Sequence, residues 1–173
     1  MRKIALFIYY IIFSKLPSSY FPLGVLFNIL RVVTLRSVIQ VGQKTKIQKN
    51  VYIGNGNNIV IGHNCQINEN VKLDNVEIGN HVMIAPGVTI IGKMHNFQNP
   101  DIPMILQGEN QSKKTIIEDD IWIGTNAIIM PGVKIEKGVI IAAGGVVTKN
   151  CNAYGVYGGV PAKLIKYREN KNN

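Results

Sequence analysis

One six-residue unit repeats without interruption from Ile117 to Asn152. The first position of every unit holds a β-branched aliphatic residue, and the fifth position holds a small or medium-sized, mostly apolar residue. A period of six matches neither an α-helix nor a single strand. It is typical of short strands joined by tight corners, in which one residue on each face points inward and stacks on its equivalent one coil later. The repeat therefore predicts an all-β chain built as a parallel β-helix.

The same period continues upstream in a less regular form. Units that begin with isoleucine are recognisable from Ile47 to Thr89, although Ile59 and Val60 are extra residues and the segment LDNVE is one residue short. We expect such slips to lie at corners and to leave the stacking intact. Because three units form one triangular coil, the two sets of repeats predict about four coils.

Between the two sets of repeats, a long irregular segment breaks the period. A long excursion from a compact repeat stack usually has a function. We therefore expect a protruding loop near residues 92–115. The sequence divides into an apolar and basic N-terminal helical segment at 1–37, a β-helix domain at 38–157 and a short basic C-terminal tail at 158–173.

The first 36 residues contain two apolar segments separated by Pro17 and Pro22, with five Lys or Arg residues and no Asp or Glu. The first apolar run is too short to span a bilayer as a helix, and no small-x-small cleavage site follows it. We expect two short helices broken at the prolines. They either cap the open strand edges of the first coil, or cap them and also contact a membrane, with their basic residues facing anionic headgroups.

The formal net charge of +9 indicates an anionic partner. Nucleic acid is a poor candidate, because the basic residues form no stripe interleaved with aromatic residues. Cys65 and Cys151 both occupy fifth positions of a unit. We interpret them as small buried residues in a reducing compartment, and the sequence shows no zinc-binding spacing.

Four segments resemble the hexapeptide-repeat acyltransferases, and most closely their sugar O-acetyltransferases, the branch that modifies galactosides, maltose, capsule or lipopolysaccharide. These segments are MHNFQNPDIPMILQG (94–108), IEDDIWIGTNAIIMPGVKI (117–135), IAAGGVVTKN (141–150) and GGVPAKLIKYR (158–168). The resemblance implies a left-handed β-helix, a homotrimer with its cleft between adjacent β-helices, and acetyl-CoA as the co-substrate without a required metal. One departure is that Met94 precedes the histidine, where many relatives have Asp or Thr.

Three histidines are available for chemistry. His63 and His81 lie at corner positions inside repeat units, where exposed polar residues are common. His95 lies at the root of the excursion, and a neutral imidazole can take the proton of an alcohol as the alcohol attacks a thioester carbonyl. The resemblance implies that His95 is the catalytic base, and the alternative is a structural histidine of the loop.

The resemblance also implies a set of residues that bind the cofactor: Trp122, Thr125, Ala143, Thr148, Lys149, Lys163 and Lys166. A small residue such as Ala143 lets the pantetheine amides reach the backbone, the lysines face phosphates, and the N–H of Thr125 fits an oxyanion donor. Some relatives have Arg where this chain has Lys163 and Lys166, so the charge is kept without bidentate contacts. Each lysine alone fits a solvated surface better, whereas the three together, spaced after the final coil, favour binding of the cofactor. Trp122 also fits a packing residue under the loop or at a subunit contact.

These features predict acetyl transfer from acetyl-CoA to a sugar hydroxyl by direct attack in a ternary complex, in capsule, O-antigen or exopolysaccharide biosynthesis. By resemblance Asn68 binds the acceptor sugar; the alternative is an ordinary corner residue. N-acetylation of an amino-sugar or nucleotide-sugar, and a non-catalytic scaffold, remain as alternatives. A zinc enzyme of the γ-carbonic anhydrase type needs a histidine triad that the spacings of 18 and 14 residues between successive histidines do not provide. We expect the protein in the cytoplasm, either free or at the inner face of the cytoplasmic membrane.

Overall fold

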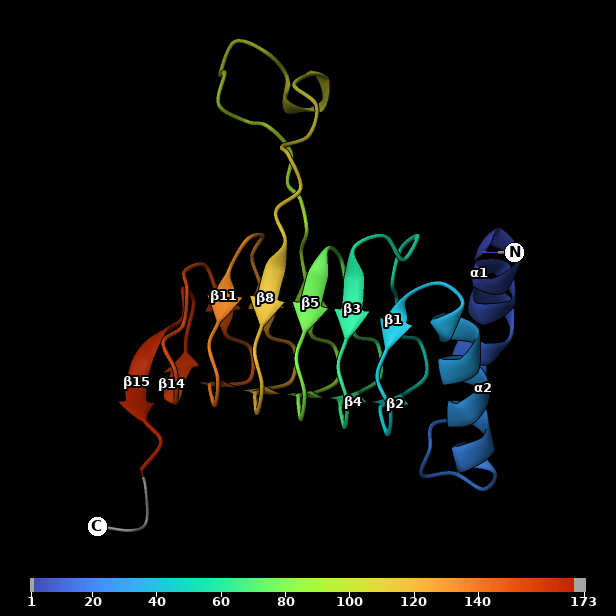
Figure 1. Ribbon diagram of the computed structural model, residues 1–173. Coiled ribbons are helices and arrows are strands. Elements are labelled where there is room, and N and C mark those ends of the chain that lie inside the picture. Colours follow the sequence, from blue (N-terminus) through green and yellow to red (C-terminus); the bar gives the residue numbers. More distant parts are fainter. Residues whose placement is uncertain (1, 170–173) are drawn as a thin grey trace.

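The computed structural model describes residues 2–169, and Met1 and residues 170–173 of the predicted basic tail lie outside that range. Short strands stack into three faces of a β-helix (Figure 1). The first face contains β1 (Gln40–Val41), β3 (Ile59–Ile61), β5 (Val76–Ile78), β8 (Thr115–Ile117) and β11 (Lys134–Ile135). The second contains β2 (Lys46–Ile47), β4 (Gln66–Ile67), β6 (Met83–Ile84), β9 (Trp122–Ile123), β12 (Ile140–Ile141), β14 (Gly155–Gly158) and β15 (Lys163–Tyr167). The third contains β7 (Thr89–Ile90), β10 (Ile128–Ile129) and β13 (Val146–Val147).

Neighbouring strands on each face run parallel, with one exception. The last strand, β15, turns back and pairs antiparallel with β14. This reversal closes the C-terminal end of the second face, because β15 occupies the edge at which another coil would otherwise be added.

The inward positions of the repeat form the core, as the sequence predicts. At the first positions, Ile123, Ile129, Ile135 and Ile141 are completely buried, and at the fifth positions Ala127 and Val139 are as well. Each buried aliphatic side chain lies on its equivalent in the next coil, so burial of apolar surface continues along the whole stack.

The corners follow a second rule at the fourth position of each unit. The backbone there is left-handed in twelve units, with φ between 55° and 76°: Lys44, Asn50, Gly56, Asn64, Asn70, His81, Gly87, Asp120, Asn126, Gly132, Gly138 and Gly144. Gly, Asn and Asp adopt this conformation at the least cost, which explains why they dominate the set. The φ of 59° and the exposed side chain of His81 confirm that it is a corner residue.

The β-helix has five strands on its first face, so it contains one coil more than the repeat predicts. The unrecognised unit begins at Val41, and its inward fifth position holds Thr45, a polar residue that hides the pattern. Thr45 is buried, and its hydroxyl donates to the carbonyl of Gly62 at 2.8 Å. The register slip leaves the stacking intact, as expected, because β3 pairs residue for residue with β5 from Ile59 to Ile61. The extra residues are absorbed in β3 itself and in the corner before it.

Two helices cover the N-terminal end of the stack, as predicted from the two apolar segments (Figure 1). They are α1 (Arg2–Ile11) and α2 (Gly24–Arg36), with the short 3-10 helix η1 (Phe13–Lys15) after α1. Within residues 2–169, no helix is long and apolar enough to cross a membrane.

These helices cap the first coil through hydrogen bonds to its open edge. The hydroxyl of Tyr9 donates to the carbonyl of Val51 at 2.7 Å, and the carboxamide oxygen of Asn28 accepts from the N–H of Ile47 at 2.8 Å. The hydroxyl of Tyr10 accepts from the N–H of Ile53. These backbone N–H and C=O groups are therefore hydrogen-bonded and no longer available to pair with a strand of another molecule.

Arg31 holds the cap together from inside, so it is not among the basic residues that could face anionic headgroups. Its side chain is fully buried. The guanidinium donates to the carbonyls of Phe13, Leu16, Pro17 and Ile47, so one side chain joins α2, the linker and the first coil. Burial lowers the pKa of Arg31, but a guanidinium stays protonated in proteins.

Between β7 and β8 the chain leaves the stack and forms a long arm, which contains the 3-10 helix η2 (Met104–Leu106) (Figure 1). We call residues 91–114 the arm. It departs from the corner between the third and first faces, which we call the third corner. The corner between the second and third faces is the second corner, and the corner between the first and second faces is the first corner.

We expect Arg31→Met to lower the free energy of unfolding by at least about 2 kcal/mol, because it leaves several buried carbonyls without a donor. Urea denaturation followed by circular dichroism measures the change. Arg36→Met is the matched control, since Arg36 is exposed, and its effect should be within about 0.5 kcal/mol. Equal effects of the two substitutions would contradict the bracing role of Arg31.

Candidate active site

A two-stranded neck positions His95 at the base of the arm. The carbonyl of Met94 accepts from the N–H of Asn110 at 2.7 Å, and the N–H of Asn96 donates to the carbonyl of Gly108 at 3.0 Å. His95 itself lies opposite Glu109 in an antiparallel bridge. The backbone on both sides of the histidine is therefore fixed, while its side chain is exposed.

An ion pair reinforces the neck. The amine of Lys93 pairs with the carboxylate of Glu109, and this hydrogen bond holds the pKa of Glu109 below its usual range. The positive charge of Lys93 is therefore partly neutralised beside His95. Both partners are exposed, so the pair orients the neck more than it stabilises the fold.

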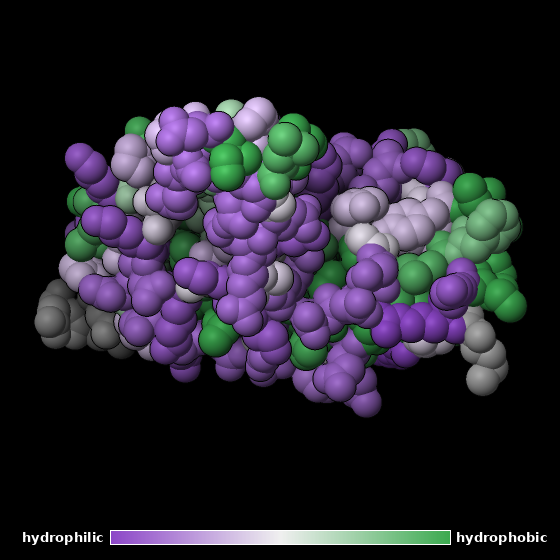
Figure 2. Space-filling view, turned by 90° about the horizontal axis from the view of Figure 1, so that it is seen from above, coloured by the Kyte–Doolittle hydropathy of each residue, from purple (hydrophilic) through white to green (hydrophobic). Residues whose placement is uncertain are grey.

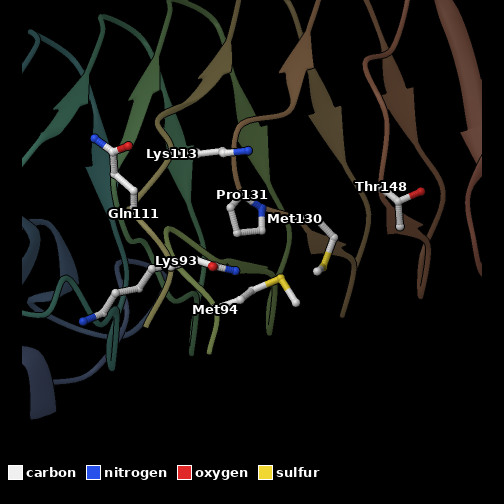
Figure 3. Close-up of a pocket in the computed structure, with 8 residues that line it drawn as sticks. Lys93, Met94, Gln111, Lys113, Met130, Pro131 and Thr148 are labelled. Carbon is white, nitrogen blue, oxygen red and sulfur yellow. The ribbon is translucent and has the colours of Figure 1, made fainter. Parts of the chain in front are cut away.

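A hollow of about 440 Å³ lies at the foot of the arm, beside the neck. Met94, Met130 and Pro131 line it with apolar atoms, and Thr148 borders it from the next coil. Figure 3 shows Met94 and Met130 pointing toward each other, whereas the amine of Lys93 points away. The remaining lining residues are Lys113, Asn110 and Gln111. No acidic residue lines the hollow, so its chemistry suits a ligand with an apolar part and an anionic part.

The outer part of the arm carries apolar side chains that contact little of the protein. Ile105 and Leu106 in η2 are 81% and 73% exposed, and Phe97, Ile102 and Met104 are exposed as well. Figure 1 shows this part standing away from the stack. Clustered exposed apolar side chains of this kind usually mark a surface that another molecule covers.

The structure places four of the predicted cofactor residues at two different corners. Thr148 and Lys149 follow β13 and lie at the third corner, on the same edge as the arm. Thr125 and Ala143 lie at the second corner in successive coils, where the N–H of Gly144 donates to the carbonyl of Thr125 at 2.8 Å. The third face separates the two pairs, so one chain does not bring all of them to His95.

Three further predicted residues lie on the second face. Trp122 in β9 is half-exposed and points outward between its neighbours Met83 and Ile140. Lys163 and Lys166 belong to β15, which is exposed along its whole length. The three lysines considered for phosphate binding therefore form two groups: Lys149 on the arm's edge, and the β15 pair near the C-terminal end.

Asn68 is at the second corner, two coils before Thr125. Its carboxamide N–H donates to the carbonyl of Ile84 at 2.9 Å, and its oxygen accepts from Gln66 at 3.1 Å. The amide is thus already used to hold its own corner. Any contact with an acceptor has to be made alongside these bonds or in exchange for them.

The other two histidines lie at the first corner, away from the arm. The ring nitrogen Nδ1 of His63 accepts from the N–H of Gln43 at 3.1 Å, and the carbonyl of His63 accepts from the N–H of His81. The three histidines therefore do not converge. In the described part of the chain, no group of three or more His, Cys, Asp or Glu side chains is placed to hold a metal ion.

Both cysteines point into the core, as the sequence predicts. They are free thiols with exposures of 2% and 1%. Burial raises the pKa of Cys65, and it raises the pKa of Cys151 to about 11. A buried thiol with a raised pKa is a poor nucleophile.

Sequence reasoning missed most of the residues that line the hollow. Met130 and Thr148 are both second positions of their units and lie 18 residues apart, one full coil. This register is a signal in the sequence that places both on one edge. No pattern in the sequence predicts that Lys113 and Asn110 approach that edge, because their position depends on the path by which the arm returns to the stack.

The comparisons with known proteins agree with this architecture. The family described as "Bacterial transferase hexapeptide (six repeats)" matches residues 58–92 and 114–149. The galactoside O-acetyltransferase of Escherichia coli K12 is 35% identical over 129 residues, which cover 73% of this chain and 62% of that protein. The chain thus spans less than two thirds of the length of this curated relative.

Two solved structures extend the likeness to almost the whole chain. A hexapeptide-repeat acetyltransferase from Vibrio cholerae is 28% identical, covers 98% of this chain and 91% of its own, and has a TM-score of 0.82. A galactoside acetyltransferase in complex with coenzyme A is also 28% identical, covers 96% and 80%, and has a TM-score of 0.75.

The coiled faces, the left-handed corner residues and the six-residue period together define a hexapeptide-repeat protein. Residues 58–92 and 114–149 carry the repeats of the bacterial hexapeptide-repeat transferases, and the fold matches the left-handed parallel β-helix of these acetyltransferases.

Proposed function

We propose that this protein transfers the acetyl group of acetyl-CoA to a hydroxyl group of a sugar. The observation that carries the proposal is the neck of the arm, which fixes the backbone of His95 directly after Met94, and Met94 lines a hollow with apolar and cationic side chains. The likeness to galactoside acetyltransferases, one of them solved with coenzyme A, supports both the sugar and the cofactor.

In this proposal His95 is the general base. The sugar hydroxyl oxygen attacks the thioester carbonyl while the imidazole accepts the hydroxyl proton. The tetrahedral intermediate then collapses, the C–S bond breaks, and the proton passes from the imidazole to the leaving coenzyme A sulfur. Backbone N–H groups at a corner, with Thr125 as the candidate, stabilise the oxyanion. The step needs no metal and no covalent intermediate on the protein.

The cofactor would lie along an edge of the β-helix. Met94, Met130 and Thr148 suit the pantetheine arm and the thioester, and Lys149, Lys163 and Lys166 suit the phosphates. Ala143 leaves room for the pantetheine amides to reach the backbone, and Trp122 borders the cofactor. We also propose that Asn68 binds the acceptor sugar.

The assembly we propose is a homotrimer in which adjacent chains share each site. Two observations support it. The third-corner group that includes His95 and the second-corner group that includes Thr125 and Ala143 lie on different edges of one chain. The exposed apolar tip of the arm, around Ile105, also needs a surface to cover it. A second copy of the chain would supply both the missing edge and that surface.

The location we propose is the cytoplasm, at the inner face of the cytoplasmic membrane, where acetyl-CoA and lipid-linked sugars of capsule, O-antigen or exopolysaccharide synthesis are both within reach. The apolar and basic N-terminal cap supports this placement. Release of free coenzyme A with a panel of sugar and nucleotide-sugar acceptors, followed by mass spectrometry of the product, tests the reaction. Absence of turnover with every hydroxyl acceptor, together with turnover on amines, would contradict O-acetylation.

We expect His95→Ala to lower turnover by roughly 10²–10⁴-fold, the range for loss of a general base. Binding of coenzyme A, measured by calorimetry, should stay near that of the parent, because the imidazole acts on the acceptor. His81→Asn is the matched control, since Asn tolerates the left-handed corner, and its turnover should be unchanged. Parent-like turnover of His95→Ala would remove His95 from the mechanism.

Replacing Lys149, Lys163 and Lys166 together by Gln should weaken binding of coenzyme A, and the deficit should be larger at low salt, because added salt screens the attraction to phosphate. Calorimetry at low and high ionic strength measures both effects. Lys137→Gln removes one positive charge at the first corner and serves as the control. If the triple variant binds as tightly as the parent at low salt, these lysines belong to the solvated surface.

Light scattering should give three chains per particle, and inactive chains should complement each other. One chain carries His95→Ala and the other carries Ala143→Trp, which obstructs the second corner. Unfolding and refolding the two together should restore part of the activity, because mixed trimers contain a site with neither substitution. A fully active monomer, or mixed particles that stay inactive, would contradict a shared site.

A further inference from the structure

The outer surface of the N-terminal cap is apolar although it faces away from the stack. In α1, Ile4, Phe7 and Ile11 recur at helical spacing and are 64%, 66% and 62% exposed. They lie opposite Tyr9, which is buried against the first coil. Figure 2 shows hydrophobic side chains gathered at the helical end of the molecule.

The second helix continues the same surface. Val25, Ile29 and Val33 are exposed at four-residue spacing on α2, on the side of the helix opposite the buried Arg31. The linker between the helices adds Tyr20, Phe21 and Leu23, all half-exposed or more. We call this set, from both helices and the linker, the cap surface. A soluble end cap needs a polar outer face, and this one is not polar.

The charges around the cap surface have one sign. Lys3 shares the exposed side of α1 with Phe7, and Arg36 follows Val33 on the exposed side of α2. Residues 1–68 contain eight Lys or Arg and no Asp or Glu, and Glu69 is the first acidic residue of the chain. A helix pair that only caps the first coil is not made more stable by having charges of a single sign. An apolar surface rimmed by cations is the pattern of proteins that lie in the interface of an anionic membrane.

A basic hollow adjoins the cap surface. Arg2 and Arg36 line it, together with residues 37–40, residues 56–60 and Lys114. The two guanidinium groups donate to the carbonyls of Asn55, Val41 and Gly42. Within residues 2–169, neither arginine pairs with a carboxylate. Their remaining N–H groups are suited to phosphate oxygens.

From these observations we propose that the cap surface docks onto an anionic lipid bilayer. Phe7, Ile11, Ile29 and Val33 enter the region below the headgroups, while Lys3 and Arg36 take lipid phosphates. The cap is braced by buried Arg31 and hydrogen-bonded to the first coil, so the surface is presented without refolding. The arm leaves the stack three coils from the cap. With about 4.8 Å per coil and about 10 Å for the helices, the catalytic neck would lie roughly 25 Å from the docked surface. A lipid-linked acceptor spans such a distance.

Flotation of the full chain with vesicles tests the docking independently of acetyl transfer. We expect the protein to float with vesicles that contain phosphatidylglycerol and to float much less with pure phosphatidylcholine. Raising the salt from about 0.1 M to about 1 M, which shortens the screening length from about 10 Å to about 3 Å, should release the charge-dependent part of the binding.

Two variants separate the apolar and the ionic parts. Phe7→Ser with Ile29→Ser should reduce flotation with both kinds of vesicle. Lys3→Glu with Arg36→Glu should reduce binding to phosphatidylglycerol by roughly tenfold or more, since each cation near an anionic leaflet contributes roughly fivefold. Ile165→Ser and Lys137→Glu are the controls, because Ile165 is 64% exposed in β15 at the far end of the stack and Lys137 is exposed at the first corner. All substituted residues are exposed, and circular dichroism confirms folding.

The parent remaining with the soluble fraction in both vesicle preparations would overturn the proposal, and so would parent-like flotation of both cap variants. If the cap surface is instead covered by a second copy, Phe7→Ser with Ile29→Ser will change the particle mass in light scattering without affecting flotation, which also overturns it. Loss of flotation in a protein that still acetylates a soluble sugar would contradict the docking alone, so the two proposals fail separately.

Discussion

The stacking of one aliphatic side chain on its equivalent in the next coil is the interaction on which the rest of this structure depends. Ile123, Ile129 and Ile135 each contribute to the interior from one face, and none is exposed to solvent. Because every coil contacts only its neighbours, stability accumulates along one dimension. The outward positions and the corners are then free to carry charge, loops and chemistry, provided that the inward positions and the left-handed corner residues are kept.

A stack of this kind has two open ends, and the chain closes them differently. At the C-terminal end β15 turns back onto β14, and the guanidinium of Arg168 reaches the carboxylate of Asp120 and the carbonyl of Gly138, both at 2.9 Å. At the N-terminal end two helices satisfy the edge of the first coil around a buried arginine. The helices do more than satisfy that edge, since their outer surface remains apolar and is rimmed by cations.

The arm connects the scaffold to the proposed chemistry. A β-helix has no cleft of its own, because its side chains fill the interior and its faces are flat. The arm creates concavity by leaving the third corner, forming a paired neck around His95 and returning along Met130. Two of the residues implied for the cofactor, Thr125 and Ala143, lie across the third face. In the proposed trimer, a site shared between chains would bring the residues of these two edges together.

The sequence by itself determined the period, the inward positions and the corner residues, because each of these depends on contacts between units that repeat. It also indicated the two N-terminal helices, the protruding segment and the position of His95 at its root. It did not reveal the first coil, because Thr45 replaces an aliphatic residue and its hydroxyl finds its partners, the carbonyl of Gly62 and the N–H of Cys65, only in the next coil.

Only the tertiary structure decided how the functional residues are grouped. Arg31 reads in the sequence as one more surface cation, and its burial depends on four carbonyls that the fold brings together. Lys149 is close in sequence to Lys163, yet one lies at the third corner and the other on β15. The reason is physical. A repeat specifies which side of a strand a residue faces, whereas the corner at which it lies depends on how many residues each preceding corner absorbs, and this count is set by packing along the entire stack.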